Sequence, residues 1–350
     1  MFDLRDLLRP HLRELIAYSS ARDDYQGSFG VFLDANENPV GSITPEKWNR
    51  YPDPYQTKLK EKIAEIKGII PGHIFLGNGS DEPIDLLFRA FCEPGVDNVI
   101  INPPTYGMYK VSADINNVTA REVLLTSDYD LDVDGIFEAM DMQTKIIFIC
   151  SPNNPTGNDV TLSKIEQVLK AYNGLVVVDE AYIDFADRPS FIEKLSAYPN
   201  LIILQTFSKA WGLASLRLGM AFFSPEILSV LNKIKAPYNL SGLTQRTVLE
   251  ALENKEEKDE MVSEILSSRT ELKRLLSELP IVKKIHPSDA NFYLVEIDNA
   301  SEYYKRLIEK KVIVRDRSKV VLCDNCLRIT VGTNYENFKL VQALKEIELV

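Results

Sequence analysis

Three short apolar runs, each followed at once by polar residues, constrain the fold of this chain more than any other feature. They lie at residues 146–149, 175–178 and 201–204. Uninterrupted apolar runs of this length are typical of strands that are buried on both faces, as in a parallel sheet. A helical pattern at 162–172 separates the first two runs, which predicts βαβ units and a mainly parallel α/β sheet. Ligands bind at the carboxyl edge of such a sheet, so the polar residues after each run are candidate site residues.

The residues after the second and third runs have the chemistry of one kind of site. Asp179 follows the second run, Ser208 and Lys209 follow the third, and Arg217 comes eight positions after the lysine. Alone, Lys209 would be a solvated surface residue and Asp179 a turn cap. Together they match what pyridoxal phosphate requires: an amine for covalent attachment, a carboxylate for the ring nitrogen, and a serine and an arginine for the phosphate. Because Arg217 lies between apolar residues, we expect its guanidinium to be buried against that anion.

A glycine-rich turn at residues 76–83 is a second candidate for the phosphate site. It opens a helix whose apolar face is predicted to consist of Ile84, Leu87, Phe88 and Phe91. Free backbone N–H groups and the positive end of the helix dipole make such a helix start an anion site. With Ser208 and Arg217 on the other side, the turn would complete a phosphate cup.

Several motifs at these strand ends resemble those of a known family. Three of them resemble the fold type I pyridoxal-phosphate aminotransferases: Asn-Asn-Pro-Thr-Gly at 153–157, Asp-Glu-Ala-Tyr at 179–182, and Ser-Lys-Ala at 208–210. Further segments resemble the histidinol-phosphate aminotransferase branch, which belongs to class II, and they lie at 33–39, 50–54, 89–95, 103–109 and 326–333. The likeness runs from about Tyr18 to the C-terminus. It implies a large domain built on a mainly parallel seven-stranded sheet, plus a smaller α+β domain.

The resemblance implies a cofactor role for each motif. Lys209, Asp179 and Tyr182 are the expected catalytic residues. Tyr106 would cover the cofactor ring, although an aromatic residue there can also be a core plug. The other implied cofactor contacts are Ser80 and Asp81 at the helix start, Ser208 and Arg217 at the phosphate, Asn154 and Tyr182 at the ring 3-oxygen, and Tyr51, which would reach the phosphate of a neighbouring subunit.

The proposed chemistry requires an unprotonated lysine. An ordinary lysine is protonated near neutral pH and is not a nucleophile. We expect burial and the charge of Arg217 to lower the pKa of Lys209. Asp179 would keep the ring nitrogen protonated, and the freed Lys209 amine would then move the substrate Cα proton.

The substrate residues follow from the resemblance as well. Tyr18 matches a tyrosine that contacts the substrate phosphate from the amino-terminal arm. Arg315 and Arg328 follow or interrupt apolar runs and match family arginines, whereas we expect Arg317 to be a surface residue. Two guanidiniums can grip a phosphate or a carboxylate by bidentate bonds. One pocket would therefore serve histidinol phosphate and then 2-oxoglutarate, giving imidazole acetol phosphate and glutamate in histidine biosynthesis.

Length and charge limit the alternatives. A chain of 350 residues predicts two domains. Its net charge of −11 argues against nucleic acid or an anionic membrane as the partner, so an anionic substrate must meet a local positive cluster. The amino terminus lacks the apolar core of a secretory signal, and no stretch approaches the ~18 apolar residues of a membrane span. We therefore expect a cytoplasmic enzyme, and Tyr51 predicts a homodimer with shared sites.

No metal or disulfide chemistry is expected. His11, His73 and His286 are scattered along the sequence, so they offer no ligand triad. Cys323 and Cys326 form a CxxC pair without a second pair or a histidine to complete a zinc site, and we interpret it as structural or incidental.

The domain division is expected at residue 243. Residues 31–243 would form the large cofactor-binding domain. A helix is expected at 54–67, before the first strand of its sheet. Residues 1–30 and 244–350 would form the arm and the small α+β domain, which the arm is expected to join. The small domain should contain strands at 292–295, 312–314 and 327–331, with helices at 301–310 and 335–347.

Three other functions stay open from the sequence. An aromatic amino-acid aminotransferase would share the fold and the chemistry. A threonine-phosphate decarboxylase would share the fold, the cofactor and phosphate recognition, but would release carbon dioxide. A pyridoxal-phosphate sensor would need a DNA-binding module, and no basic helix–turn–helix precedes the expected fold.

Overall fold

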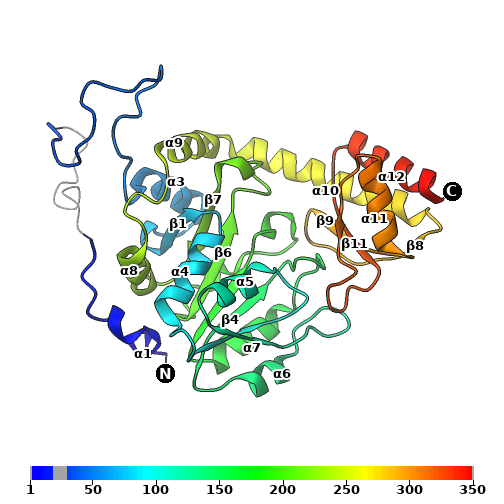
Figure 1. Ribbon diagram of the computed structural model, residues 1–350, viewed down its shortest axis with the longest axis horizontal. Helices are drawn as coiled ribbons and strands as arrows, with labels where there is room; N and C mark the ends of the chain where they lie inside the picture. The colour runs from blue at the N-terminus through cyan, green and yellow to red at the C-terminus, as the bar shows by residue number, and fades with distance from the viewer. Residues whose placement is uncertain (1, 19–29, 349–350) are drawn as a thin grey trace.

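A seven-stranded sheet forms the centre of the larger part of the molecule in this computed structural model, which describes residues 2–18 and 30–348 (Figure 1). The strands follow the order β1-β7-β6-β5-β4-β2-β3. Only β7 is antiparallel to its neighbours, β6 and β1, while the other neighbouring pairs are parallel. The bounds are β1 Ile74–Asn78, β2 Asn98–Ile101, β3 Thr119–Glu122, β4 Thr144–Cys150, β5 Leu175–Asp179, β6 Leu201–Thr206 and β7 Leu218–Phe222. The predicted α/β fold with a mainly parallel seven-stranded sheet is confirmed.

The central strands are apolar throughout because both faces of the sheet are covered. Along β5, Val176 and Val178 belong to one core cluster, while Leu175 and Val177 belong to the other. Successive strand residues point to opposite faces, so a run without polar residues is what a doubly covered strand requires. One face is covered by α3 Thr57–Lys67, α6 Val133–Ala139 and α7 Leu162–Ala171, and the other by α4 Asp81–Phe91, α5 Met108–Ile115 and α8 Pro225–Ile234.

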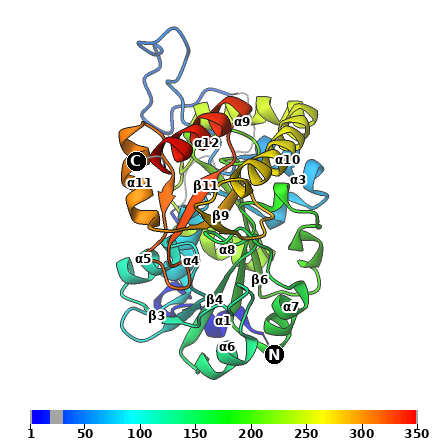
Figure 2. The same ribbon diagram turned by 90° about the vertical axis from the view of Figure 1, so that its right-hand side faces the viewer.

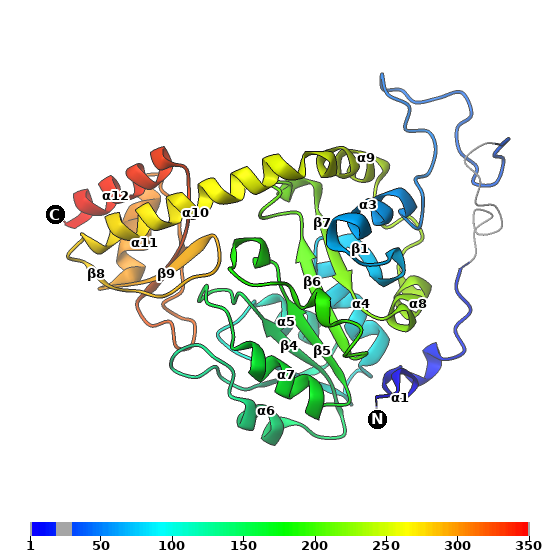
Figure 3. The same ribbon diagram turned by 180° about the vertical axis from the view of Figure 1, so that it is seen from behind.

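A second, four-stranded sheet forms the smaller part, with all neighbouring strands antiparallel. Its order is β10-β11-β9-β8, with β8 Val282–Ile285, β9 Phe292–Ile297, β10 Arg315–Asp316 and β11 Cys326–Thr330. Helices α11 Ala300–Glu309 and α12 Asn334–Glu348 lie beside it (Figure 2). Helix α9 Gly242–Ala251 precedes the long helix α10 Lys255–Ser277, which connects the two parts of the molecule (Figure 3). No helix in the described ranges is long and apolar enough to cross a membrane.

Two expected elements differ from the structure in detail. The helix expected at 54–67 begins at Thr57, because the Asp53 carboxylate accepts a hydrogen bond from the Thr57 backbone N–H at 2.6 Å. The strand expected at 312–314 is wrong. The chain there is irregular, and the short strand β10 begins at Arg315, where backbone pairing with β11 becomes available.

The first residues of the amino-terminal arm contact the larger part of the molecule. Helix α1, Leu4–Leu7, places Leu7 in the core cluster on the α4 face, and the Arg9 backbone N–H donates to the Ala90 carbonyl at 3.1 Å. The sequence predicts that this arm joins the smaller part, but its leucines pack on an apolar surface beside α4. The boundaries 31–243 and 244–350 stay predictions.

Candidate active site

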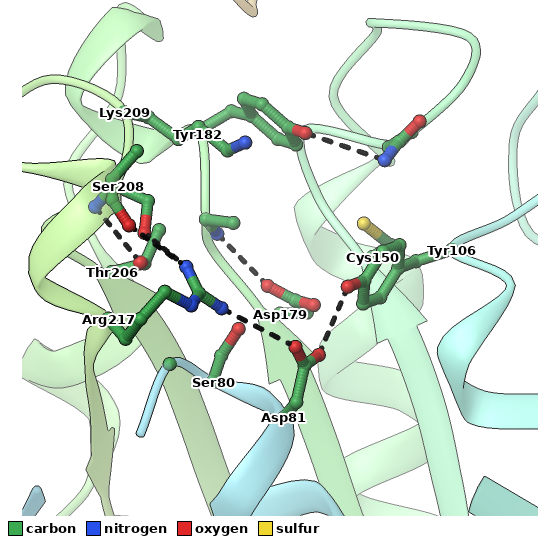
Figure 4. A pocket seen from close by; sticks show the side chains of 14 residues that line it. Ser80, Asp81, Tyr106, Cys150, Asp179, Tyr182, Thr206, Ser208, Lys209 and Arg217 are labelled. Atoms are coloured by element: carbon green, nitrogen blue, oxygen red, sulfur yellow. Dashed lines mark hydrogen bonds and ion pairs between the residues drawn. The ribbon is translucent and has the colours of Figure 1, made fainter. Parts of the chain in front are cut away.

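A cavity opens at the carboxyl ends of β4, β5 and β6, beside the first turn of α4 (Figure 4). Nine of the residues expected at the site line it: Ser80, Asp81, Tyr106, Asn154, Asp179, Tyr182, Ser208, Lys209 and Arg217. Asp179 ends β5, and three more of the nine follow β5 or β6 within three residues, which is where a parallel sheet delivers ligand-binding groups.

One wall of the cavity is built for an anion. Gly79 and Ser80 precede α4, whose first-turn N–H groups face the cavity with the positive end of the helix dipole. This turn lies against β7 so closely that a Cβ on Gly219 would meet the Gly79 carbonyl carbon at 2.2 Å. Only glycine allows that approach, and it brings the turn next to Arg217, whose carbonyl accepts a hydrogen bond from the Gly79 N–H at 2.7 Å.

Arg217 supplies the positive charge on this wall. Its backbone is left-handed, with φ 52°, a strained conformation that for a non-glycine residue is concentrated at functional sites. Its guanidinium lies 3.5 Å from the Ser208 hydroxyl and 3.8 Å from the Asp81 carboxylate. The expectation of a buried guanidinium is wrong, because 53 % of the side chain is exposed. The exposed part faces the cavity, where an anion has direct access to it.

Lys209 lies in the turn after β6 and is the cavity's amine. No hydrogen bond or ion pair within the described residues engages its Nζ, which lies 5.7 Å from the centre of the Tyr182 ring. Loss of surrounding solvent, followed by the charges of Arg328 and Arg217, lowers the pKa of Lys209. The lowered pKa agrees with the expectation from the sequence. The charge of Arg328 is a cause of the shift that the sequence did not reveal.

Asp179, the last residue of β5, is a carboxylate held in the floor of the cavity. It is 3 % exposed, and its Oδ1 accepts a hydrogen bond from the Ala181 N–H at 3.0 Å. Burial raises the pKa of Asp179 to about 6. A buried carboxylate with so few protein donors is well matched to a cationic group of a ligand.

Asn154 connects the cofactor side of the cavity to the smaller sheet. Its amide Nδ2 donates to the Tyr182 hydroxyl at 3.4 Å, and its Oδ1 accepts from the Arg328 guanidinium at 2.5 Å. Phe292 of β9 supports both partners, since its ring meets Tyr182 edge-on at 5.1 Å and lies under the Arg328 guanidinium at 5.3 Å. Sequence reasoning missed Phe292, because an aromatic residue at a strand start usually indicates core packing.

Two tyrosines reach the site, Tyr106 from the loop before α5 and Tyr109 from the first turn of α5. The Tyr106 hydroxyl donates to Asp81 at 3.0 Å, so Tyr106 is a cavity wall rather than a core plug. The Tyr109 hydroxyl donates to Asp179 Oδ2 at 2.6 Å. Tyr109 was also missed by sequence reasoning, although its spacing of three from Tyr106 at a helix start would have placed both on one side.

Four expected residues do not line the cavity of the same chain: Tyr18, Tyr51, Arg315 and Arg328, the last of which reaches it only through Asn154. Tyr51 is 50 % exposed and stacks on Tyr238 with ring centres 4.4 Å apart, and Tyr18 is 76 % exposed. Arg315 is exposed on β10 and pairs directly across the ladder with Arg328, so both side chains lie on one face of the sheet.

Arg317 is not the surface residue that we expected. It is partly buried, its backbone N–H continues the ladder to Cys326 at 2.9 Å, and its buried Nε has no hydrogen-bond partner. Ladder geometry places it two positions after Arg315 on the same face of the sheet. No carboxylate among the described residues forms an ion pair with Arg315, Arg317 or Arg328, so this face presents unneutralised positive charge.

The fold and the site define a class of enzyme. The family model for aminotransferase class I and II matches residues 30–344. The chain therefore belongs to the class I and II aminotransferase family.

The relatives narrow the assignment within that family. Histidinol-phosphate aminotransferase from Cytophaga hutchinsonii is 56 % identical over 344 residues, which cover 98 % of this chain and 99 % of the relative. The enzyme of the same name from Parabacteroides distasonis is 53 % identical over 349 residues and covers the whole of both chains. The chain therefore belongs, within the class I and II aminotransferases, to the family of these histidinol-phosphate aminotransferases.

Solved structures agree on the fold. The histidinol-phosphate aminotransferase from Sinorhizobium meliloti, solved in complex with pyridoxal-5'-phosphate, superimposes with a TM-score of 0.79 at 23 % identity over 97 % of this chain and 98 % of that chain. The cavity fits the same cofactor. It offers an unengaged amine at Lys209, a buried carboxylate at Asp179, and an anion site formed by the α4 start and Arg217.

Proposed function

We propose that this protein transfers the amino group of histidinol phosphate to 2-oxoglutarate, using pyridoxal phosphate, and so produces imidazole acetol phosphate and glutamate for histidine biosynthesis. The observation that carries the proposal is the convergence of Lys209, Asp179 and an anion site in one cavity, with an unneutralised arginine face beside it. The full-length identity to histidinol-phosphate aminotransferases supports the substrate assignment.

The residues of the cavity would have separate roles in the reaction. When bound, pyridoxal phosphate supplies an electron-accepting ring for the electrons released as the substrate Cα–H bond breaks. Asp179 would hold the proton on the ring nitrogen, because a cation there would relieve the cost of burying its carboxylate. Asn154 and Tyr182 form a hydrogen-bonded pair that would contact the ring 3-oxygen.

Lys209 has two tasks. Its amine would hold the cofactor and, when free, would move the substrate Cα proton. The lowered pKa of Lys209 favours the unprotonated amine that both tasks need. Tyr106 would limit the movement of the ring from the cavity wall, where its bond to Asp81 holds it.

The arginine face would recognise the distal anion of each substrate. A protein with a net charge of −11 repels a phosphate dianion unless local cations meet it. Arg328 is held at the site by Asn154 and by Phe292, and Arg315 lies opposite it in the ladder. Two like charges directly opposite each other are unfavourable in a sheet, and an anion bound between them would relieve this repulsion.

We expect Arg328→Ala to lower kcat/KM by about ten- to a hundred-fold, since a charge-assisted hydrogen bond is worth about 1.5–3 kcal/mol. The same pocket holds both distal anions, so the two half-reactions should both slow when followed separately by stopped-flow absorbance. Arg306→Ala, on the exposed side of α11 beside Glu302, serves as the control and should behave as wild type. An Arg328→Ala enzyme with two unaltered half-reactions would contradict the substrate assignment.

A single titration separates the candidate functions. Histidinol phosphate should change the absorbance of the bound cofactor, and 2-oxoglutarate should then restore it. Release of carbon dioxide from threonine phosphate would instead support a decarboxylase, and a faster first half-reaction with phenylalanine would support an aromatic aminotransferase.

We also propose that the enzyme is a cytoplasmic homodimer with shared sites. Residues 31–43 stand off the body of the subunit (Figures 1 and 3) and expose apolar side chains. Val31, Leu33, Val40 and Ile43 are each at least 85 % exposed, which is unfavourable unless another surface covers them. A second copy of the chain is the partner that this segment fits, and it would bring Tyr51 to the neighbour's phosphate site and Tyr18 to its substrate.

Mixing two inactive variants tests the shared site. If Tyr51 serves the neighbour, a dimer of one Lys209→Ala subunit and one Tyr51→Ala subunit contains one complete site, so mixing should restore activity toward half of the wild-type value per mixed dimer. Sedimentation should show a dimer throughout. A fully active monomer, or mixtures no more active than their components, would refute the shared site.

A further inference from the structure

The hydrogen bond between Tyr109 and Asp179 is the strongest feature of the site that the reaction described above does not use. The phenol donates to Oδ2 at 2.6 Å, and both side chains are buried, with exposed fractions of 0 % and 3 %. Tyr109 does not line the cavity, so it acts on a ligand only through Asp179.

The phenol is fixed in place by its ring. Tyr109 is the second residue of α5, and its ring stacks on Phe148 of β4 with centres 4.8 Å apart and 17° between planes. On its other side it meets the Tyr106 ring edge-on at 5.5 Å. Burial holds the pKa of Tyr109 well above its usual value, so the group stays a phenol and a donor at neutral pH.

The groups around Asp179 shift its pKa in opposite directions. Burial raises its pKa most, and Asp81 and Glu180 raise it further. Tyr109 and the Ala181 N–H lower it. Across the cavity Lys209 faces the carboxylate, while the buried Cys150 thiol lies beside the Tyr109 hydroxyl and stays protonated because burial raises its pKa.

We propose that Tyr109 is a positioning residue that keeps the proton on the cofactor ring nitrogen rather than on Asp179. This inference rests on the proposed function. A hydrogen bond donated to a carboxylate stabilises its charged form and makes it less basic. The proton shared between the carboxylate and the pyridine nitrogen therefore stays on the nitrogen, where it makes the ring a better electron acceptor.

The test is Tyr109→Phe, which removes the hydroxyl and keeps the ring. Wild type and variant are loaded with ¹⁵N-labelled pyridoxal phosphate, and the ring-nitrogen resonance is measured by NMR. We expect the resonance of the variant to shift toward that of neutral pyridine, with kcat lower by on the order of ten-fold and KM nearly unchanged. Tyr172→Phe is the control, because this half-buried tyrosine at the end of α7 donates its hydroxyl to the Thr144 carbonyl at 2.7 Å, away from the site.

The outcomes are distinct. A Tyr109→Phe enzyme whose ring nitrogen stays as protonated as in wild type overturns the inference, even if kcat falls. Phe148→Leu, which loosens the stack and keeps the hydroxyl, should give a smaller shift in the same direction and serves if Tyr109→Phe does not fold. A wild type that binds no cofactor would overturn the proposed function itself, whereas an unshifted resonance in a loaded variant overturns this inference alone.

Discussion

Replacing Lys209 with alanine is expected to lower kcat by more than about 10³-fold and to leave the fold unchanged. Proton transfer by a positioned group contributes about 10²–10⁴-fold, and the variant also loses the covalent link to the cofactor. Within the described residues, Lys209 is the only lysine that lines the cavity, so no other amine can take its place. Its side chain is exposed to the cavity, and its removal should therefore cost little stability.

Borohydride reduction followed by peptide mass spectrometry identifies the lysine that carries the cofactor. Wild type should carry the reduced cofactor on Lys209, and Lys209→Ala should carry none while it still binds the cofactor non-covalently at the anion site. Lys170→Ala, on the exposed face of α7, should label and turn over like wild type. Reduced cofactor on any other lysine of the wild type would remove Lys209 from the mechanism.

The fold and the polar groups at the strand ends could be predicted because their causes are local. A run such as 175–178 is entirely apolar only when both faces of a strand are covered, and the observed alternation between two core clusters is that situation. Parallel strands then bring their carboxyl ends together. Asp179 and Lys209 meet in one cavity for that reason, although thirty positions separate them in the sequence.

The residues that sequence reasoning missed act through tertiary contacts. A buried tyrosine such as Tyr109 has the same sequence pattern whether its hydroxyl meets a backbone carbonyl or a catalytic carboxylate. Phe292 looks like any aromatic residue at a strand start. Arg317 was misjudged for another reason: the expected strand ended at 314, so the alternation that places Arg317 on the same face as Arg315 was hidden.

Replacing Asp179 with asparagine should produce opposite changes in activity and in the stability of the cofactor-free protein. The activity should fall by about 10²–10³-fold in kcat with little change in KM, as is typical when one preorganised charge is removed from a site. The neutral amide fills the same space, and its oxygen can still accept from the Ala181 N–H, while its Nδ2 would donate to the Tyr109 hydroxyl in place of the bond that Oδ2 accepts. It cannot hold a proton on the ring nitrogen, so the loss falls on the step in which the ring accepts electrons.

The stability of the cofactor-free protein should rise at neutral pH. The pKa of Asp179 is raised to about 6 in the folded state, against about 3.9 when unfolded, so the carboxyl group favours folding at low pH and this contribution is lost as pH rises through 6. At pH 7 the ionised, buried group opposes folding by up to roughly 3 kcal/mol, which asparagine would relieve. Asp141→Asn is the control of opposite sign, because hydrogen bonds lower the pKa of Asp141 to about 2 and its charge favours folding at pH 7. Thermal unfolding of both variants between pH 4 and 8 measures the difference: if Asp179→Asn destabilises the cofactor-free protein at pH 7, or turns over normally with cofactor, Asp179 is not the strained carboxylate that a ring cation neutralises.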